Sequence, residues 1–132
     1  MKAAILSVGT ELVTGQCVDT NSAWLSTRLT ECGMEVVEHL TVGDDVARLE
    51  QAIRRTIAAS ELVIITGGLG PTADDITRDG IARAIDASLE EDAGALAQIH
   101  AFFDRWQRPM PDSNRLQALI PRGCTVLPNA RG

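Results

Sequence analysis

The chain has 132 residues, of which 45% are hydrophobic and only 3% aromatic, so we expect one domain with an aliphatic core. Its formal net charge of -6 argues against binding to the phosphate backbone of nucleic acid, which requires a basic face. No stretch approaches the roughly 20 apolar residues of a membrane span, and the N-terminal apolar run is too short for a signal peptide. We therefore expect a cytoplasmic protein.

Strand-like and helix-like periodicities alternate along the chain, which predicts an α/β fold with helices on both faces of a mostly parallel sheet. The expected architecture is three-layer α/β/α, with residues 1–132 forming a single domain. The chain stops just after the last predicted strand, so we expect this domain to be truncated at its C-terminal end. The predicted strands are 3–8, 34–42, about 63–65 and 125–127, and the predicted helices are 21–32, 46–57, 78–85, 90–106 and 114–119.

The most informative stretch follows the strand at 63–65, where Gly67, Gly68 and Gly70 form a turn. Glycine lacks a Cβ, so the backbone N–H groups of such a turn can approach an anion closely and positive φ is unstrained. Thr77 is expected to cap the helix at 78–85, whose N-terminal dipole favours an anion at the same place. We expect a phosphate here, and a side chain at Gly68 to occupy the space that the phosphate needs.

Two carboxylates, those of Asp74 and Asp75, lie between the glycine turn and the following helix. Because they repel a phosphate unless a cation lies between them, the pair predicts a divalent metal such as Mg²⁺. A purely structural turn is the alternative, since glycine-rich turns also permit tight packing. The residues match neither G-x-G-x-x-G nor the P-loop pattern, so neither a Rossmann nor a Walker nucleotide site is indicated.

Further polar residues lie where the first two predicted strands end. Thr10 and Glu11 follow the first strand, Asn21 opens the first helix, and Asp44 follows the second strand. Loops at the carboxyl ends of parallel strands form the ligand crevice of such folds, so we expect these residues to converge with the glycine turn. Helix capping is the alternative role for Asn21 and Asp44.

An apolar stripe with aromatic residues runs along the helix predicted at 90–106. Its members recur at three- and four-residue spacing, which places them on one helical face. Such a stripe predicts a core contact or a contact between subunits. The residues are Leu96, Ile99, Phe103 and Trp106.

Five separated segments carry a specific resemblance to a known family. They are Ser7-Val-Gly-Thr-Glu-Leu with Gly15 and Asp19-Thr-Asn, then Val42-Gly-Asp-Asp, Thr66-Gly-Gly-Leu-Gly-Pro-Thr-x-Asp-Asp-x-Thr, and Asn114-Arg-x-Gln-Ala with Pro121. In this order, over essentially the whole chain, they resemble the N-terminal domain of the CinA competence/damage-inducible proteins. That domain belongs to the molybdopterin-binding superfamily of MogA, MoaB and the central domain of MoeA.

The resemblance implies a MogA-like fold and metal-dependent hydrolysis of the ADP-ribose pyrophosphate to AMP and ribose 5-phosphate. It implies that Asp75, with Asp74, is catalytic and binds the metal. It also implies a small nucleotide or pterin phosphate as ligand, and self-association into a homo-oligomer. The residues expected to bind the phosphate or nucleotide are Gly67, Gly68, Gly70, Thr77, Thr10, Glu11, Asn21, Asp44 and Asn114.

Two other functions stay open. The pterin relatives bind a pterin phosphate and adenylylate it, which makes a molybdopterin-binding or adenylyltransferase domain the first alternative. Leu69 stands where those enzymes usually have threonine, which favours the CinA branch. The second alternative is a catalytically silent nucleotide-binding or assembly module, because CinA-type domains continue past Gly132 into a segment that helps to close the site.

Overall fold

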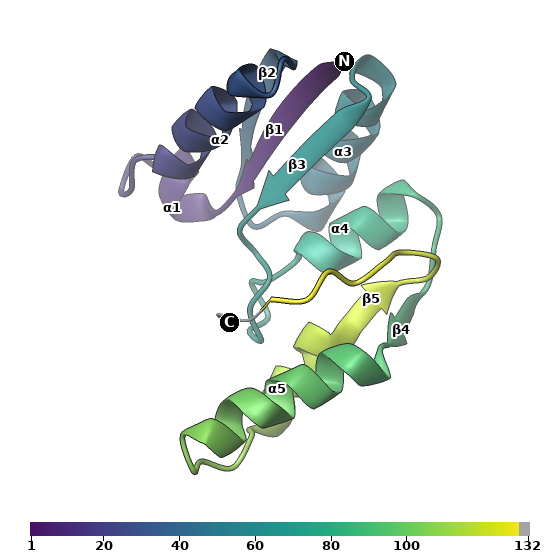
Figure 1. Ribbon diagram of the computed structural model, residues 1–132. Coiled ribbons are helices and arrows are strands. Elements are labelled where there is room, and N and C mark those ends of the chain that lie inside the picture. The colour runs from purple at the N-terminus through teal and green to yellow at the C-terminus, as the bar shows by residue number, and fades with distance from the viewer. Residues whose placement is uncertain (130–132) are drawn as a thin grey trace.

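The computed structural model describes residues 1–129 and contains both helices and short strands (Figure 1). In chain order, the elements are β1 (Lys2–Val8), α1 (Thr10–Val13), α2 (Thr20–Glu31), β2 (Glu35–Val42), α3 (Val46–Ala59), β3 (Leu62–Thr66), α4 (Thr77–Ala84), β4 (Leu89–Glu91), α5 (Ala93–Arg105), the 3₁₀ helix η1 (Asp112–Ala118) and β5 (Leu119–Pro121). No helix within residues 1–129 is long and apolar enough to cross a membrane.

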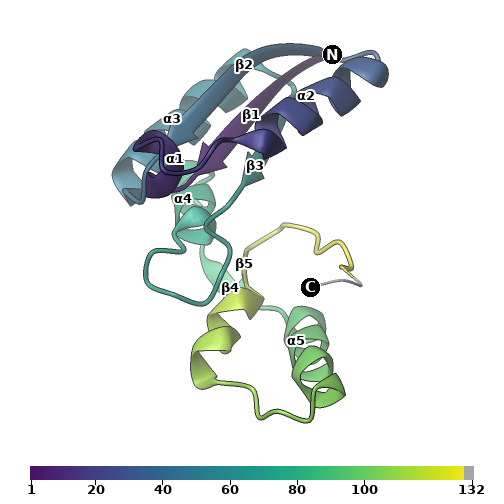
Figure 2. The ribbon, with the colours of Figure 1, turned by 90° about the vertical axis from the view of Figure 1, so that its left-hand side faces the viewer.

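A parallel sheet of three strands, in the order β2-β1-β3, forms the centre of the larger part of the molecule. Side chains alternate across β1, so Ile5 packs toward α2 while Leu6 packs toward α3 and α4. Figures 1 and 2 show α2 on one face of the sheet and α3 on the other. The predicted three-layer α/β/α arrangement is therefore confirmed.

The pairing of β1 with β2 contains one surplus residue. Ala3 pairs with Val36 and the next residue, Ala4, pairs with Glu38, so Val37 is skipped. Because of this shift, Val36 packs on the α2 side, whereas Leu40 packs on the α3 side. One strand thus contributes apolar side chains to both cores.

Aspartate side chains cap the N-terminal ends of three of the helices. Asp19 accepts a hydrogen bond from the backbone N–H of Ser22 at the start of α2, at 3.0 Å. Asp45 accepts from two amides at the start of α3, and Asp92 accepts from one at the start of α5. These bonds satisfy N–H groups that have no partner within a helix, which explains where each helix starts.

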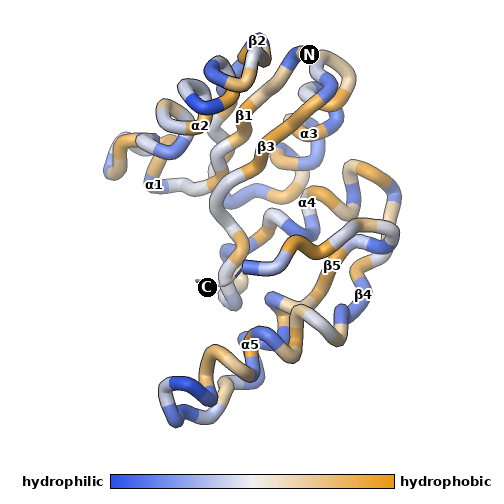
Figure 3. Tube along the Cα trace, viewed as in Figure 1, coloured by the Kyte–Doolittle hydropathy of each residue, from blue (hydrophilic) through white to orange (hydrophobic). Residues whose placement is uncertain are grey.

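A smaller unit follows α4 and consists of a short antiparallel pair, β4 with β5, packed beside α5 and η1 (Figure 1). In Figure 3, β3 is an apolar stretch, whereas the residues of this smaller unit alternate between polar and apolar along the chain. The chain after β5 runs back toward the glycine-rich segment that follows β3 (Figure 1).

Several predicted boundaries were wrong. Glu90 and Glu91 were expected in the first turn of a helix, but they lie in β4, where Glu91 forms an ion pair with Arg115 of η1. The segment 125–127 is not a strand, and the central sheet has three strands rather than four. Thr77 is the first residue of α4, not its cap, because its hydroxyl is bonded elsewhere.

Candidate functional site

The loops that follow β2, β1 and β3 lie side by side, because these strands are neighbours in a parallel sheet. Thr10 and Asp44 connect the first two of these loops. The Thr10 hydroxyl donates to Asp44 Oδ2 at 2.8 Å, and the backbone N–H of Asp44 donates back to the same hydroxyl at 3.1 Å. The predicted convergence of Thr10 and Asp44 is present in the structure.

The third loop, residues 67–75, is called the glycine loop below. Gly67 and Gly68 both have positive φ, 87° and 62°. A Cβ on Gly67 would overlap the backbone carbonyl oxygen of Val8, and a Cβ on Gly68 would overlap the Thr77 hydroxyl. A side chain at Gly68 therefore points into the protein, not into ligand space as the sequence suggested. Both glycines are required by backbone conformation and close packing.

Thr77 holds the start of the glycine loop against α4. Its hydroxyl donates to the carbonyl oxygen of Gly67 at 2.7 Å. Its backbone N–H donates to the carbonyl oxygen of Gly68 at 3.1 Å. Thr77 is almost fully buried, so it stabilises the loop from within. Within residues 1–129, the backbone N–H groups of Gly67 and Gly68 donate to no other group, which leaves two donors available for an anion.

Asp75 shapes the second half of the glycine loop. Its Oδ2 accepts from the backbone N–H of Thr72 at 2.8 Å and from the Thr72 hydroxyl at 2.6 Å. The hydroxyl bond is the main reason that the pKa of Asp75 is lowered; burial opposes it, and backbone N–H groups and the charge of Arg78 add to it. Asp75 is therefore ionised at neutral pH. Asp74 beside it is exposed.

Arg78 is a functional candidate that the sequence analysis missed. Its guanidinium donates to the carbonyl oxygens of Leu69 and Gly70, each at 2.6 Å, and the side chain is buried. Burial lowers the pKa of Arg78, whereas the charges of Asp75 and Asp79 raise it. Its position after Thr77, close in sequence to the glycine turn, was the one available signal.

The remaining predicted residues lie around this centre. The Glu11 carboxylate lies against the backbone of Gly9, where a Cβ would collide with it. Asn21 is exposed in the first turn of α2, and no hydrogen bond within residues 1–129 connects it to the glycine loop. Asn114 donates to Gln117 at 2.8 Å, and Gln117 in turn lies 3.4 Å from the carbonyl oxygen of Leu69.

A second polar chain, also missed, fixes the loop that carries Thr10 and Glu11. The buried hydroxyls of Ser7 and Ser22 lie 2.9 Å apart, and Ser22 donates to Asp19 at 2.6 Å. Burial raises the pKa of Asp19, but bonds from Ser22 and Ser7 outweigh it and lower the pKa overall. This chain joins β1 to the start of α2.

An apolar cavity of about 590 Å³ adjoins the glycine loop. Leu69 and Pro71 of the loop form one wall, α5 contributes Ile99 and Phe103, and Asn114 lies at its edge. The stripe predicted on α5 therefore does not have one environment along its length. Ile99 and Phe103 line this cavity, whereas Trp106 is 68% exposed.

The acidic residues alone do not make a metal cage. In the part of the chain that the structure describes, no group of three or more His, Cys, Asp or Glu side chains could hold a metal ion. Mg²⁺ is commonly held by one or two carboxylates together with substrate phosphates and water. The exposed Asp74 and the ionised Asp75 are two consecutive carboxylates of the glycine loop, the number that such a site uses.

The fold places the chain among α/β domains whose ligand crevice lies at the carboxyl ends of parallel strands. A family model described as a probable molybdopterin binding domain matches residues 4–130. The crystal structure of CinA from Thermoplasma acidophilum, described there as having unknown function, is similar at a TM-score of 0.89 and 36% identity, over 99% of this chain and 76% of that chain. The chain therefore belongs to the molybdopterin-binding family, within its CinA group.

One curated relative agrees with this assignment, and one more distant solved structure shares the fold. A protein of Geobacillus sp. (strain WCH70) named as a competence-damage inducible protein is 48% identical over the whole chain, which covers 32% of that protein. The chain thus spans about a third of the length of such curated relatives. MoaB from Thermus thermophilus is 20% identical at a TM-score of 0.59, over 91% of this chain and 78% of that chain, which shows the shared fold alone.

Proposed function

We propose that this domain hydrolyses the pyrophosphate bond of ADP-ribose to AMP and ribose 5-phosphate, with the help of a divalent metal ion. The observation that carries the proposal is the glycine loop. Two backbone N–H groups without a partner within residues 1–129, those of Gly67 and Gly68, belong to the same loop as the ionised carboxylate of Asp75. Donors for one phosphate and a ligand for a cation thus occur together.

In this reaction, the amides of Gly67 and Gly68 bind and orient one phosphate of the substrate. Asp75, with Asp74, would hold the cation, which would polarise the phosphate and lower the pKa of the attacking water. The water oxygen bonds to one phosphorus, the bridging P–O bond breaks toward the other phosphate, and the water's proton passes to solvent. AMP and ribose 5-phosphate leave as the two phosphomonoesters.

Adenylylation of a pterin phosphate is the competing enzymatic function. The likeness to MoaB shows the fold, and a fold is compatible with many reactions. Leu69, which is about half exposed at the cavity wall, presents no hydroxyl to a ligand there. We therefore place ADP-ribose hydrolysis first, and a catalytically silent nucleotide-binding module last.

The direct experiment incubates the purified chain with ADP-ribose and Mg²⁺, Mn²⁺ or EDTA, and follows AMP and ribose 5-phosphate by chromatography. Formation of both products in equal amounts, with metal only, is the expected result. Products from molybdopterin and ATP instead would favour the adenylyltransferase function. Binding of AMP by calorimetry without either reaction would identify a silent module.

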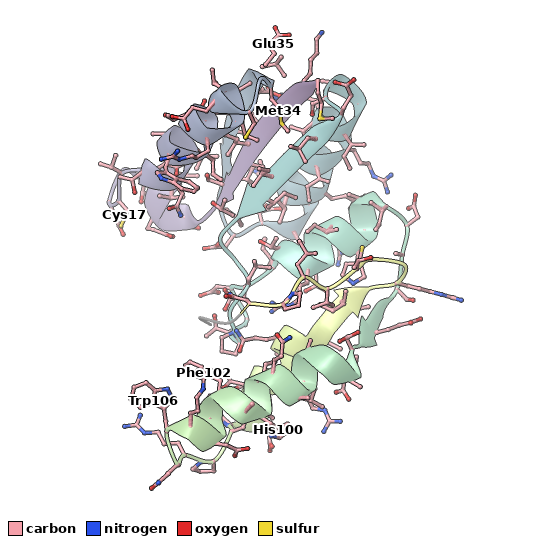
Figure 4. All side chains as sticks on the ribbon, in the orientation of Figure 1. Cys17, Met34, Glu35, His100, Phe102 and Trp106 are labelled. Carbon is pink, nitrogen blue, oxygen red and sulfur yellow. The ribbon has the colours of Figure 1, made fainter. Side chains whose placement is uncertain are left out.

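We also propose that the domain self-associates. Trp106 is largely exposed near the C-terminal end of α5, close to Phe102, as Figure 4 shows. Large exposed aromatic side chains are common at protein contacts. Light scattering at micromolar concentration tests this proposal: a mass of 14.1 kDa would identify a monomer and contradict it.

A further inference from the structure

Arg78 differs from the arginines of this protein that form ion pairs. Only 8% of its surface is exposed, and it makes no ion pair with a carboxylate of residues 1–129. Arg54 and Arg115, by contrast, are exposed and pair with acidic side chains. Asp75 and Asp79 act on Arg78 through their charges but form no ion pair with it, and burying a cation without an ion pair is costly, so the position of Arg78 needs an explanation.

The explanation lies in the peptide groups that Arg78 contacts. The planar guanidinium reaches two consecutive carbonyl oxygens, those of Leu69 and Gly70, at 2.6 Å each. In a trans peptide the C=O and N–H point in opposite directions, so fixing the Leu69 carbonyl also fixes the Gly70 N–H. The Asp75 carboxylate lies directly against Gly70, where an added Cβ would collide with Oδ2, and the Gly70 N–H helps to lower the pKa of Asp75. Arg78 and Asp75 therefore contact the same Leu69–Gly70 peptide, Arg78 at the carbonyl of Leu69 and Asp75 beside Gly70.

Resting on the function proposed above, we propose that Arg78 is a positioning residue for the phosphate and cation site. It acts through the Leu69–Gly70 peptide, which it fixes so that the Asp75 carboxylate and the Gly67 and Gly68 amides keep one arrangement. Its buried positive charge also opposes the repulsion between a polyphosphate and the two carboxylates of the glycine loop.

The experiment compares Arg78→Met and Arg78→Lys with a matched control, Arg54→Met. Arg54 also donates to a backbone carbonyl, that of Arg83 at 2.7 Å, but at the opposite end of α4. Two readouts are used: kcat and KM for ADP-ribose, and the NMR shift of the Gly68 amide on titration with inorganic pyrophosphate and Mg²⁺. Thermal melting confirms that each variant is folded at the assay temperature.

We expect Arg78→Met to lower kcat/KM by about 100-fold, with KM raised, because phosphate contacts are lost in the ground state as well. Arg78→Lys should resemble Arg78→Met, since an ammonium cannot fork to both carbonyls. Arg54→Met should lower the melting temperature without changing kcat/KM. Full activity in Arg78→Lys would show that charge alone suffices and would overturn the positioning role.

The pyrophosphate titration separates this inference from the proposed reaction. If the wild-type chain binds pyrophosphate at Gly68 but does not hydrolyse ADP-ribose, the proposed function fails while the role of Arg78 is still measured. The Gly68 shift is expected in the wild type and in Arg54→Met, and is expected to be lost in folded Arg78→Met. A missing wild-type shift, or a shift as large as that of the wild type in the folded Arg78 variants, would overturn the inference. Arg78→Lys carries the comparison if Arg78→Met does not fold.

Discussion

Two threonine–aspartate pairs stand on opposite sides of the candidate site, and they hold it in different ways. Thr72 and Asp75 are three residues apart and close a single loop, with bonds of 2.8 and 2.6 Å. Thr10 and Asp44 are 34 residues apart and connect the loops after β1 and β2, at 2.8 Å. The same two residue types thus make a local contact on the β3 side and a long-range contact on the other side.

The comparison shows that the β3 side is constrained much more strongly. There the glycine loop is also fixed by Thr77 and Arg78, two buried residues of α4. On the β1–β2 side, both residues of the pair that joins the two loops are exposed. Substitutions on the β3 side should therefore have larger effects on activity and on the free energy of unfolding than substitutions on the β1–β2 side.

The largest effect is expected for Asp75→Asn, which keeps the size of the side chain and removes its charge. Loss of the proposed cation ligand should lower kcat for ADP-ribose by about 1000-fold, while AMP binding is retained or improved because phosphate repulsion falls. Kinetics and calorimetry measure the two effects. Asp104→Asn, at an exposed position on α5, changes the net charge equally and should have wild-type kcat. Unchanged metal-dependent turnover in Asp75→Asn would end the catalytic assignment.

Gly68→Ala tests the packing of the same loop. The added Cβ meets the Thr77 hydroxyl at a φ of 62°, so strain and overlap should lower the free energy of unfolding by about 3 kcal/mol. Gly43→Ala is the matched control on the β1–β2 side, where the nearest atom, the Thr10 hydroxyl oxygen, is 3.3 Å away. Urea unfolding should show a loss of less than about 1 kcal/mol for that variant. Equal losses of unfolding free energy in Gly68→Ala and Gly43→Ala would contradict the tighter packing of the β3 side.

Thr72→Val should lower stability by about 1 kcal/mol in a pH-dependent manner. The Thr72 hydroxyl is the main cause of the low pKa of Asp75, so the folded pKa lies below the ordinary value of 3.8. This stabilisation is present above the unfolded pKa and is lost as pH falls through the folded pKa. Urea unfolding should therefore show the difference from wild type at neutral pH and its disappearance in acid. Thr27→Val, on α2, should show no such pH dependence; a pH-independent Thr72→Val effect would contradict the mechanism.

The smallest effect is expected for the long-range pair. A double-mutant cycle of Thr10→Val and Asp44→Asn should give a coupling energy of about 0.5 kcal/mol, because both groups are solvated. Urea unfolding of the two single variants and the double variant measures it. The same cycle is made for Thr72 and Asp75. A larger coupling energy for Thr10 with Asp44 than for Thr72 with Asp75 would contradict the stronger constraint on the β3 side.

Much of the fold could be predicted because its strands and helices carry strong periodic patterns. The β4–β5 pair could not, since each strand is very short and the partners, such as Glu91 and Leu119, lie far apart in the sequence. Glu90 and Glu91 favour a helix N-terminus by local preference, but pairing of Glu91 with Arg115 stabilises the strand instead. Tertiary contacts overrode a local signal there.

Residues of the glycine loop that are close in sequence were expected to lie together, and they do. The glycine loop, Asp75 and Thr77 belong to one motif, although Thr77 bonds to Gly67 rather than capping the helix. The direction of the Gly68 Cβ and the two carbonyls that Arg78 contacts depend on three-dimensional placement, which residue types and spacing do not specify. Asn21 was expected near the glycine loop because it belongs to a motif, but it is exposed in the first turn of α2.

The surplus residue in β2 has a consequence for how the length of this chain can vary. Val37 has no partner in β1, and a strand without it would alternate regularly, with Val36 and Leu40 on opposite faces as they are now. Deleting Val37 alone would therefore leave Val36 with α2 and Leu40 with α3. Deleting Leu40 instead would turn part of the strand over and place a polar side chain in one core. The strand can therefore lose one residue at Val37 without changing which side chains face each core, but it cannot lose one at Leu40.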